Sequence, residues 1–161
     1  MFNNLKEDLK RNDNKMSKIA VVIYRYGNWI YYKVKIPIVR QLLYLIYKIL
    51  NFIYFTLIAG AEVPAKCKIG KGLVLAHGAK GIVINPEVII GENAYIIHHV
   101  TIGSIGNGIP KVGNNVLIGV GAKILGDVTI GNSTKIGANA TVVKDVPDGC
   151  TAVSPAASIK M

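Results

Sequence analysis

Residues 112–142 read VGNNVLIGVGAKILGDVTIGNSTKIGANATV and repeat with a period of six. An aliphatic residue begins each hexad, and glycine follows it in most of them. An amphipathic helix would need apolar spacings of three and four, and a half-buried antiparallel strand would need a period of two. The hexad instead predicts a left-handed parallel β-helix, in which three short strands and three corners make one coil of about eighteen residues.

The same period of six extends toward the N-terminus and, apart from two breaks, covers residues 61–142. Thirteen aliphatic positions follow it: Val63, Ile69, Leu75, Ile84, Ile90, Ile96, Ile102, Val112, Ile118, Ile124, Ile130, Ile136 and Val142. The fifth residue of many hexads is small or β-branched, as expected for a side chain that packs inside a narrow prism. We therefore expect the prism to begin near residue 61.

Composition divides the chain near Gly60. Residues 1–60 contain ten Lys and Arg against three Asp and Glu, so they carry +7 of the net charge of +10, and they hold eleven of the twelve aromatic residues. Fifteen of the seventeen glycines come after Gly60. We predict a basic, aromatic-rich helical segment at 1–60 and a left-handed β-helix domain with a C-terminal tail at 61–161.

Several classes of protein are excluded by composition. With 51% hydrophobic and 17% charged residues, the chain is too apolar to be intrinsically disordered. Cys67 and Cys150 are far apart, so no disulfide framework or CxxC pair is present. The first fifteen residues lack the apolar core of a signal peptide, which favours a cytoplasmic location. No nucleic-acid-binding motif accompanies the basic residues, so nucleic acid is not an expected partner.

Residues 36–59, IPIVRQLLYLIYKILNFIYFTLIA, predict one long apolar helix that starts at Pro37 and stops at Gly60. Three interpretations remain open: a transmembrane span, a helix lying in the membrane interface, or a helix packed on the prism. Lys48 and Asn51 would lie near the middle of a span, which is costly. The interfacial helix is favoured, with an anionic membrane surface as partner of residues 1–60.

The hexad breaks twice, at AHGAKG (76–81) and at SIGNGIPK (104–111). A stacked coil cannot take extra residues internally, so both segments should bulge outward as loops. Loops on a rigid scaffold are frequent sites of catalysis. The alternative is that they are insertions with no function, which surface loops tolerate.

All three histidines of the chain lie at or near the first break. His77 and His98 each occupy the third place of a hexad, so they should stack on one corner, about 4.8 Å apart. Adjacent His98 and His99 would point to opposite faces on an extended strand. Imidazole is the usual general base near neutral pH. Glu62 lies outside the core fifteen residues before His77 and could orient that ring or be a plain surface charge.

The runs AEVPAKCKIGKGLVLAHGAKGIVI (61–84), HHVTIG (98–103), GIPKVGNNVLIGVGAKILGDVTIG (108–131) and KIGANATVVKDVP (135–147) carry a family resemblance. They resemble the serine O-acetyltransferase group of hexapeptide acyltransferases, and more closely the small colanic-acid and capsule O-acetyltransferases. The resemblance implies that His77 is the general base and Glu62 its partner. Backbone amides of residues 77–81 would then be donors to the tetrahedral oxyanion.

The resemblance also implies acetyl-CoA as co-substrate, a homotrimer with sites between neighbouring subunits, and no metal. The groove beside the corners would hold the pantetheine arm, and nearby lysines the CoA phosphates. The residues implied for CoA are Gly119, Val120, Lys123, Lys135, Gly137, Ala138 and Lys144. Further candidates near the acceptor are His98, His99, Asn85 and Lys111.

Two departures from serine acetyltransferases bear on the acceptor. Ile109 stands where they have a histidine before Pro-Lys, and Ala76 replaces the acidic residue before the loop histidine. Together with the short N-terminal segment, they favour a sugar hydroxyl in exopolysaccharide or capsule biosynthesis, on a polymer or a lipid-linked precursor. The enzyme would lie on the inner face of the cytoplasmic membrane.

Three other functions remain open. The first is serine O-acetyltransferase activity in cysteine biosynthesis. The second is a zinc lyase of the γ-carbonic-anhydrase type, which shares this fold and uses three histidines as ligands. The third is a membrane-bound scaffold without catalytic activity, against which the clustering of His77 and Glu62 argues.

Overall fold

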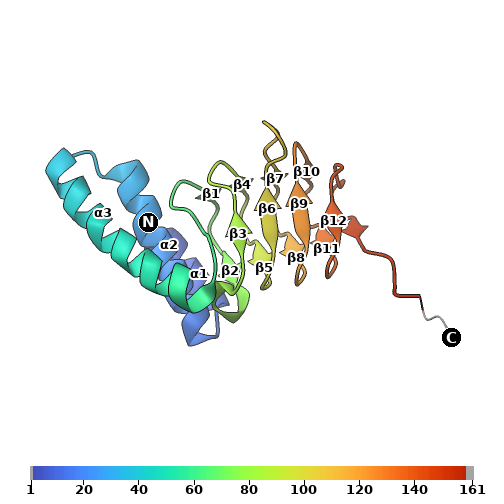
Figure 1. Cartoon of the computed structure of the whole chain (residues 1–161), viewed down its shortest axis with the longest axis horizontal. Helices are drawn as coiled ribbons and strands as arrows, with labels where there is room; N and C mark the ends of the chain where they lie inside the picture. The colour runs from blue at the N-terminus through green and yellow to red at the C-terminus, as the bar shows by residue number, and fades with distance from the viewer. Residues whose placement is uncertain (1, 159–161) are drawn as a thin grey trace.

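The computed structural model describes residues 2–158, and these form a group of N-terminal helices followed by a prism of stacked strands (Figure 1). The helices are α1 (Phe2–Arg11), α2 (Lys15–Lys33) and α3 (Pro37–Asn51), and α3 continues directly into the π-helical segment η1 (Phe52–Ala59). The helices lie across one end of the prism, and the C-terminus leaves at the other. Residues 159–161 of the predicted tail lie outside the described residues.

Three parallel sheets form the sides of the prism. The first contains β1 (Lys68–Ile69), β4 (Ile89–Ile90), β7 (Lys111–Val112) and β10 (Thr129–Ile130). The second contains β2 (Val74–Leu75), β5 (Tyr95–Ile96), β8 (Leu117–Ile118), β11 (Lys135–Ile136) and β13 (Thr151–Ala152). The third contains β3 (Val83–Ile84), β6 (Thr101–Gly103), β9 (Lys123–Leu125) and β12 (Thr141–Val142). The predicted left-handed parallel β-helix with N-terminal helices is confirmed.

The hexad positions form the core of the prism. All thirteen aliphatic residues are buried, with at most 6% of any one exposed. In most strands the first residue points outward and the second inward, because side chains alternate along an extended chain. Equivalent hexad positions of successive coils pair in register, as Ile96 does with Ile118 and Ile118 with Ile136.

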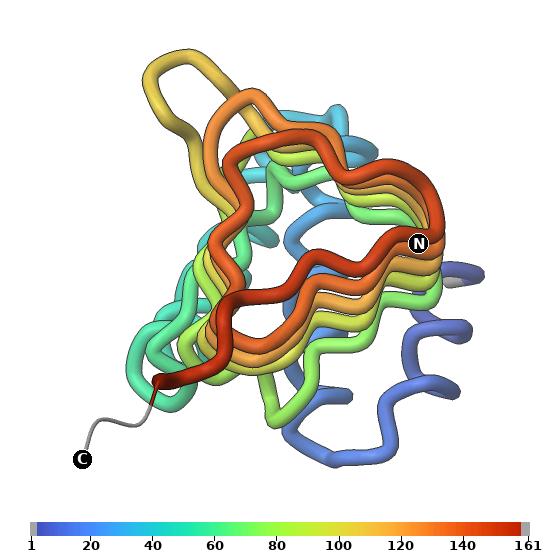
Figure 2. Tube along the Cα trace, turned by 90° about the vertical axis from the view of Figure 1, so that its right-hand side faces the viewer, coloured from blue at the N-terminus to red at the C-terminus, as the bar shows by residue number. Residues whose placement is uncertain are grey.

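The two breaks in the hexad are loops outside the prism, as predicted. The first contains the short helical turn η2 (Ala76–Ala79) between β2 and β3. The second, residues 104–111, stands away from the triangular outline of the coils (Figure 2). Its tip is a tight turn in which Ile105 and Gly108 hydrogen-bond to each other through their backbones.

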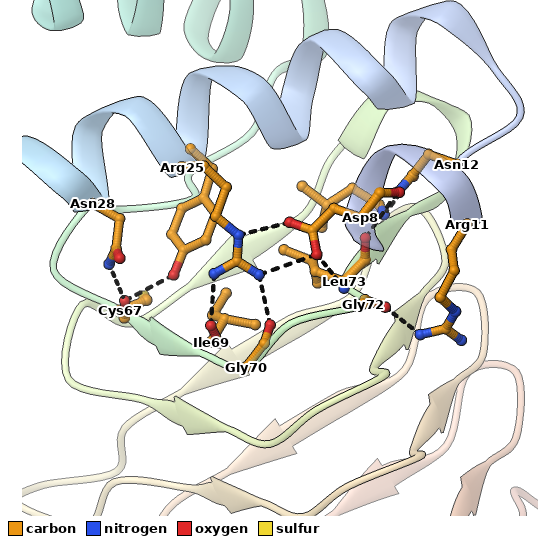
Figure 3. A network of polar contacts seen from close by, with 12 residues as sticks. Asp8, Arg11, Asn12, Arg25, Asn28, Cys67, Ile69, Gly70, Gly72 and Leu73 are labelled. Carbon is orange, nitrogen blue, oxygen red and sulfur yellow. Dashed lines mark hydrogen bonds and ion pairs between the residues drawn. The ribbon is translucent and has the colours of Figure 1, made fainter. Parts of the chain in front are cut away.

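The N-terminal helices cover the first coil through a buried polar network (Figure 3). Arg25 Nε donates to Asp8 Oδ2 at 2.6 Å, and the same guanidinium donates to the carbonyl oxygens of Ile69 and Gly70. The Leu73 amide donates to Asp8. Neither charged side chain is more than 3% exposed, so each compensates the other's lost hydration. The network supplies partners to backbone groups at the open edge of the first coil.

The long apolar helix has the predicted extent. It begins at Pro37 and ends at Ala59, and Gly60 takes the left-handed conformation (φ 57°) that ends many helices. By length and composition this helix could cross a membrane, although length and composition alone do not establish a span. Buried residues of the helices and the prism form one continuous hydrophobic core.

Candidate active site

His77 and His98 lie on the same corner of neighbouring coils. Their ring centroids are 4.8 Å apart and the rings meet edge to face. This is the spacing between adjacent strands, so the stacking predicted from the hexad count is confirmed. His77 is exposed on its loop, where a substrate could reach it.

His99 also lies beside His98, which corrects the expectation that it points to the opposite face. Its ring centroid is 5.3 Å from that of His98. The reason is local: His99 has a φ of 59°, so the chain turns at this corner and is not an extended strand. No group of three His, Cys, Asp or Glu side chains within residues 2–158 is arranged to hold a metal ion.

The surroundings of His98 lower its pKa. Its pKa lies below the ordinary 6.5, first because the ring is desolvated and then because His77, His99 and Lys80 are close enough to repel a positive charge. Within the described part of the chain its Nδ1 atom is buried and has no hydrogen-bond partner. The surroundings of this ring therefore disfavour its protonated form next to His77.

The backbone of the His77 loop is unusual. His77, Gly78 and Ala79 all have positive φ values, of 54°, 73° and 65°. For His77 and Ala79 this conformation is strained, so surrounding contacts must hold it. The sequence does not show which contacts do so.

Two side chains from the helices hold Gly78 in place. The Gly78 amide donates to Ser17 Oγ of α2 at 3.1 Å. The Tyr54 hydroxyl of η1 is shared between the carbonyl oxygens of Met16, at 2.6 Å, and Gly78, at 3.1 Å. Burial raises the pKa of Tyr54 to about 12, so its hydroxyl stays a donor at neutral pH. These residues were missed by the sequence analysis, because no motif links them to His77.

Fewer backbone amides of residues 77–81 are free to act as oxyanion donors than the sequence analysis predicted. The Gly78 amide is taken by Ser17, and the Gly81 amide donates to the Ala59 carbonyl oxygen at 2.9 Å. Both are therefore occupied inside the protein. A donor from this loop would have to come from its other residues.

Glu62 lies on the third face of the prism, one coil before Val83. Its amide donates to the Ile82 carbonyl oxygen at 2.7 Å, and its own carbonyl accepts from Ile84. The side chain is exposed and lines a cleft of about 450 Å³ between the helices and the first coil, together with Tyr44, Lys48 and Asn51. Among residues 2–158 its carboxylate makes no hydrogen bond or ion pair, so its role as the partner of His77 stays a prediction.

The residues predicted for CoA continue the histidine corner along the prism. The Gly121 amide donates to the His98 carbonyl oxygen, and the Asn139 amide donates to the Val120 carbonyl oxygen. His98, Val120 and Ala138 thus lie on one corner of successive coils. A side chain at Gly119 would collide with the backbone of Ala138, so packing alone already requires this glycine.

The predicted lysines lie on the outer surface. Lys123 is in the third sheet and Lys135 in the second, so they flank the corner on its two sides, and Lys144 follows β12. Lys123 Nζ also donates to the Gly121 carbonyl oxygen at 3.1 Å. All three ammonium groups belong to exposed residues.

Two other candidates lie away from the histidines within one chain. Asn85 follows β3 at a different corner, where its side chain donates to Ser104 Oγ at 3.2 Å at the base of the second loop. Lys111 is in the first sheet, at the end of the same loop. Neither residue is brought to the His77 corner by the fold of a single chain.

Comparison with known proteins agrees with the fold and refines the class. Residues 109–144 match the family described as bacterial transferase hexapeptide (six repeats). Serine acetyltransferase from Synechococcus elongatus is 34% identical over 138 residues, which is 83% of this chain and 52% of that protein. Serine acetyltransferase from Helicobacter pylori is 44% identical over 100 residues, 60% of this chain and 58% of that protein.

Solved structures give the same result. Serine acetyltransferase from Neisseria gonorrhoeae in complex with serine is 29% identical with a TM-score of 0.75, over 93% of this chain and 65% of that one. The enzyme from Brucella abortus in complex with coenzyme A is 28% identical with a TM-score of 0.70, over 89% and 55%. The chain is thus similar to hexapeptide-repeat acyltransferases of the serine acetyltransferase type. It spans a little over half the length of the curated relatives named above.

These relatives overturn the predicted acceptor. They are serine acetyltransferases, so the preference for a sugar hydroxyl is wrong and its alternative, serine, is supported. None of the proteins named above indicates closeness to polysaccharide O-acetyltransferases. The structure explains the error: Ile109 packs against the hydrophobic core and Ala76 is 7% exposed. Both positions therefore reflect packing more than the choice of acceptor.

Proposed function

We propose that this protein transfers the acetyl group of acetyl-CoA to the hydroxyl of serine. The observation that carries the proposal is the exposed His77 on a strained loop, stacked on His98 in a fold similar to serine acetyltransferases over most of the chain. The complexes of related enzymes with serine and with coenzyme A support the same pair of substrates.

In the proposed reaction His77 accepts the proton of the serine hydroxyl while that oxygen attacks the thioester carbonyl carbon. The tetrahedral intermediate collapses as the carbon–sulfur bond breaks, and the leaving thiolate takes the proton from the imidazolium. The lowered pKa of the neighbouring His98 disfavours a second positive charge that would oppose protonation of His77. Glu62 is the proposed carboxylate that stabilises the imidazolium.

The proposal places CoA along the corner that runs from His98 through Val120 to Ala138. Lys123 and Lys135 are exposed on the two sides of this corner and would meet its phosphates. Lys144 follows β12, toward the corner of Asn85, so within one chain it is not beside them. A homotrimer is part of the proposal, since Asn85 and Lys111 lie away from His77 within one chain and could contribute from a neighbouring subunit.

Product analysis tests the acceptor. The purified protein is mixed with acetyl-CoA and L-serine, and in parallel with free hexoses, and the products are identified by mass spectrometry. O-acetylserine formed well above the level without enzyme supports the proposal. Acetylated hexose without O-acetylserine contradicts it.

A further inference from the structure

Helix α3 and segment η1 present a continuous apolar surface to solvent, which we call the apolar face. Its residues are each between 41% and 72% exposed: Ile38, Val39, Leu42, Leu45, Ile46, Ile49, Leu50, Phe52, Ile53, Leu57 and Ile58. Soluble proteins rarely leave so large an apolar area uncovered, so such a surface marks an interaction site.

The opposite side of the same helix is already occupied. Tyr47, Tyr54 and Phe55 are at most 5% exposed and pack into the shared core. Tyr47 lies directly over Gly27 of α2, where any side chain would overlap its ring. Because one side is fixed to α2, the helix is placed to lie along a surface and not to cross one alone.

Every charged residue of the helices that carry the apolar face is basic, and the acidic Glu62 joins Lys48 in the cleft at the first coil. Residues 14–61 contain seven basic and no acidic residues. Of these, Arg25 is buried against Asp8, while Lys15, Lys33, Lys35, Arg40 and Lys48 are exposed. None of these five forms an ion pair within residues 2–158. Two copies joined through this face would bring like charges together, whereas an anionic lipid surface would be attracted.

A cationic cleft opens at the N-terminal end of the apolar face. It has a volume of about 420 Å³ and is lined by Tyr31, Lys35, Pro37, Arg40, Gln41 and Tyr44. The Arg40 guanidinium lies 5.7 Å from the centre of the Tyr31 ring. Two cations and two hydroxyl groups in one cleft suit a phosphate group, and the neighbouring aliphatic side chains suit acyl chains.

We infer that the apolar face is a membrane-docking surface, on which an anionic phospholipid places its phosphate in the Lys35–Arg40 cleft and its acyl chains against α3 and η1. The helix lies in the plane of the interface, with tyrosines at the level of the headgroups. Docking of this kind does not depend on the reaction proposed above.

The test measures binding of the full chain to vesicles of phosphatidylcholine alone and of phosphatidylcholine with phosphatidylglycerol. Wild-type protein should sediment with the anionic vesicles and be partly released by high salt. The double variant Lys35→Gln/Arg40→Gln should bind them about 25-fold more weakly, from about fivefold for each charge. The control Lys123→Gln/Lys144→Gln removes two exposed lysines of the later coils, one in β9 and one just after β12, and should change vesicle binding little.

A second pair of substitutions tests the apolar contribution. Leu42→Gln/Leu45→Gln should weaken binding to both kinds of vesicle and at both salt concentrations, because both side chains are more than half exposed on the apolar face. Circular dichroism and gel filtration would confirm that each variant is folded. Binding of both double variants at the wild-type level overturns the proposal. A different result would also overturn the proposal: the wild type does not bind lipid, its trimers pair as the concentration rises, and Leu42→Gln/Leu45→Gln abolishes this pairing. The apolar face would then be a contact with a second copy of the chain.

Discussion

Tyr54 and Tyr24 use the same chemistry at different places in the molecule. Each is a buried tyrosine of the helical segment whose hydroxyl donates to a backbone carbonyl oxygen of the prism. Tyr54 donates to Gly78 in the loop of His77, whereas Tyr24 donates to Cys67 at 2.8 Å, in the first coil. Substituting each tyrosine therefore distinguishes an effect on the His77 loop from a general effect on stability.

Tyr54→Phe should lower kcat for acetyl transfer by about fivefold, since losing a hydrogen bond of about 1 kcal/mol lets the strained loop leave its conformation. Tyr24→Phe should cost a similar free energy of unfolding with kcat unchanged. The measurements are steady-state kinetics and urea unfolding of both variants. Equal effects of the two on kcat would show that Tyr54 does not position His77.

The lowered pKa of His98 predicts a dependence of stability on pH. Below pH 6.5 the unfolded chain binds a proton at this histidine more readily than the folded chain does, so the free energy of unfolding falls as the pH drops. His98→Gln should make the loss between pH 7 and pH 5 smaller than in the wild type. Urea unfolding at the two pH values checks this, and an unchanged or larger loss in the variant contradicts it.

At the level of elements, the strands of the prism could be predicted from the sequence, whereas the contacts between the helices and the prism could not. The position of a residue in the hexad predicts whether its side chain is buried, because each coil repeats the same local geometry. The separation of 21 residues likewise sufficed to stack His77 on His98. The turn that brings His99 beside them depends on a positive φ at His99, and a sequence pattern of extended strands does not contain it.

The contacts between helices and prism depend on residues far apart in the chain. Asp8 and Arg25 meet at the edge of the first coil through the packing of α1 and α2, and neither belongs to a recognisable motif. Ser17 and Tyr54 reach Gly78 in the same way. The sequence analysis identified the apolar helix but not its contacts with the His77 loop.

The Asp8–Arg25 pair should contribute strongly to the attachment of the helices. Arg25→Gln leaves a buried carboxylate without its charged partner and should lower the free energy of unfolding by about 3 to 5 kcal/mol. The exposed pair of Lys66 and Glu87 is the control, and Glu87→Gln should change the free energy of unfolding little, because solvent screens this pair. Chemical denaturation compares them, and similar small losses in both would mean that the helices do not depend on the buried pair.

At the scale of the whole molecule, the prism and its helices act as one body with two surfaces. The His77 corner lies beside η1, and the apolar face is on the free side of the same helical segment. Three chains are expected to assemble, so light scattering of the full chain should give about three times the 17.3 kDa chain mass. A monomer at working concentration would contradict sites shared between subunits.

The most direct test of the central claim is the rate of CoA release from acetyl-CoA with L-serine by the wild type and by His77→Ala. We predict a rate that depends on serine concentration in the wild type. In the folded variant kcat should fall by at least about 100-fold, the lower end of general base catalysis. A wild-type rate that serine does not change, or a His77→Ala variant that turns over serine as fast as the wild type, would contradict the claim.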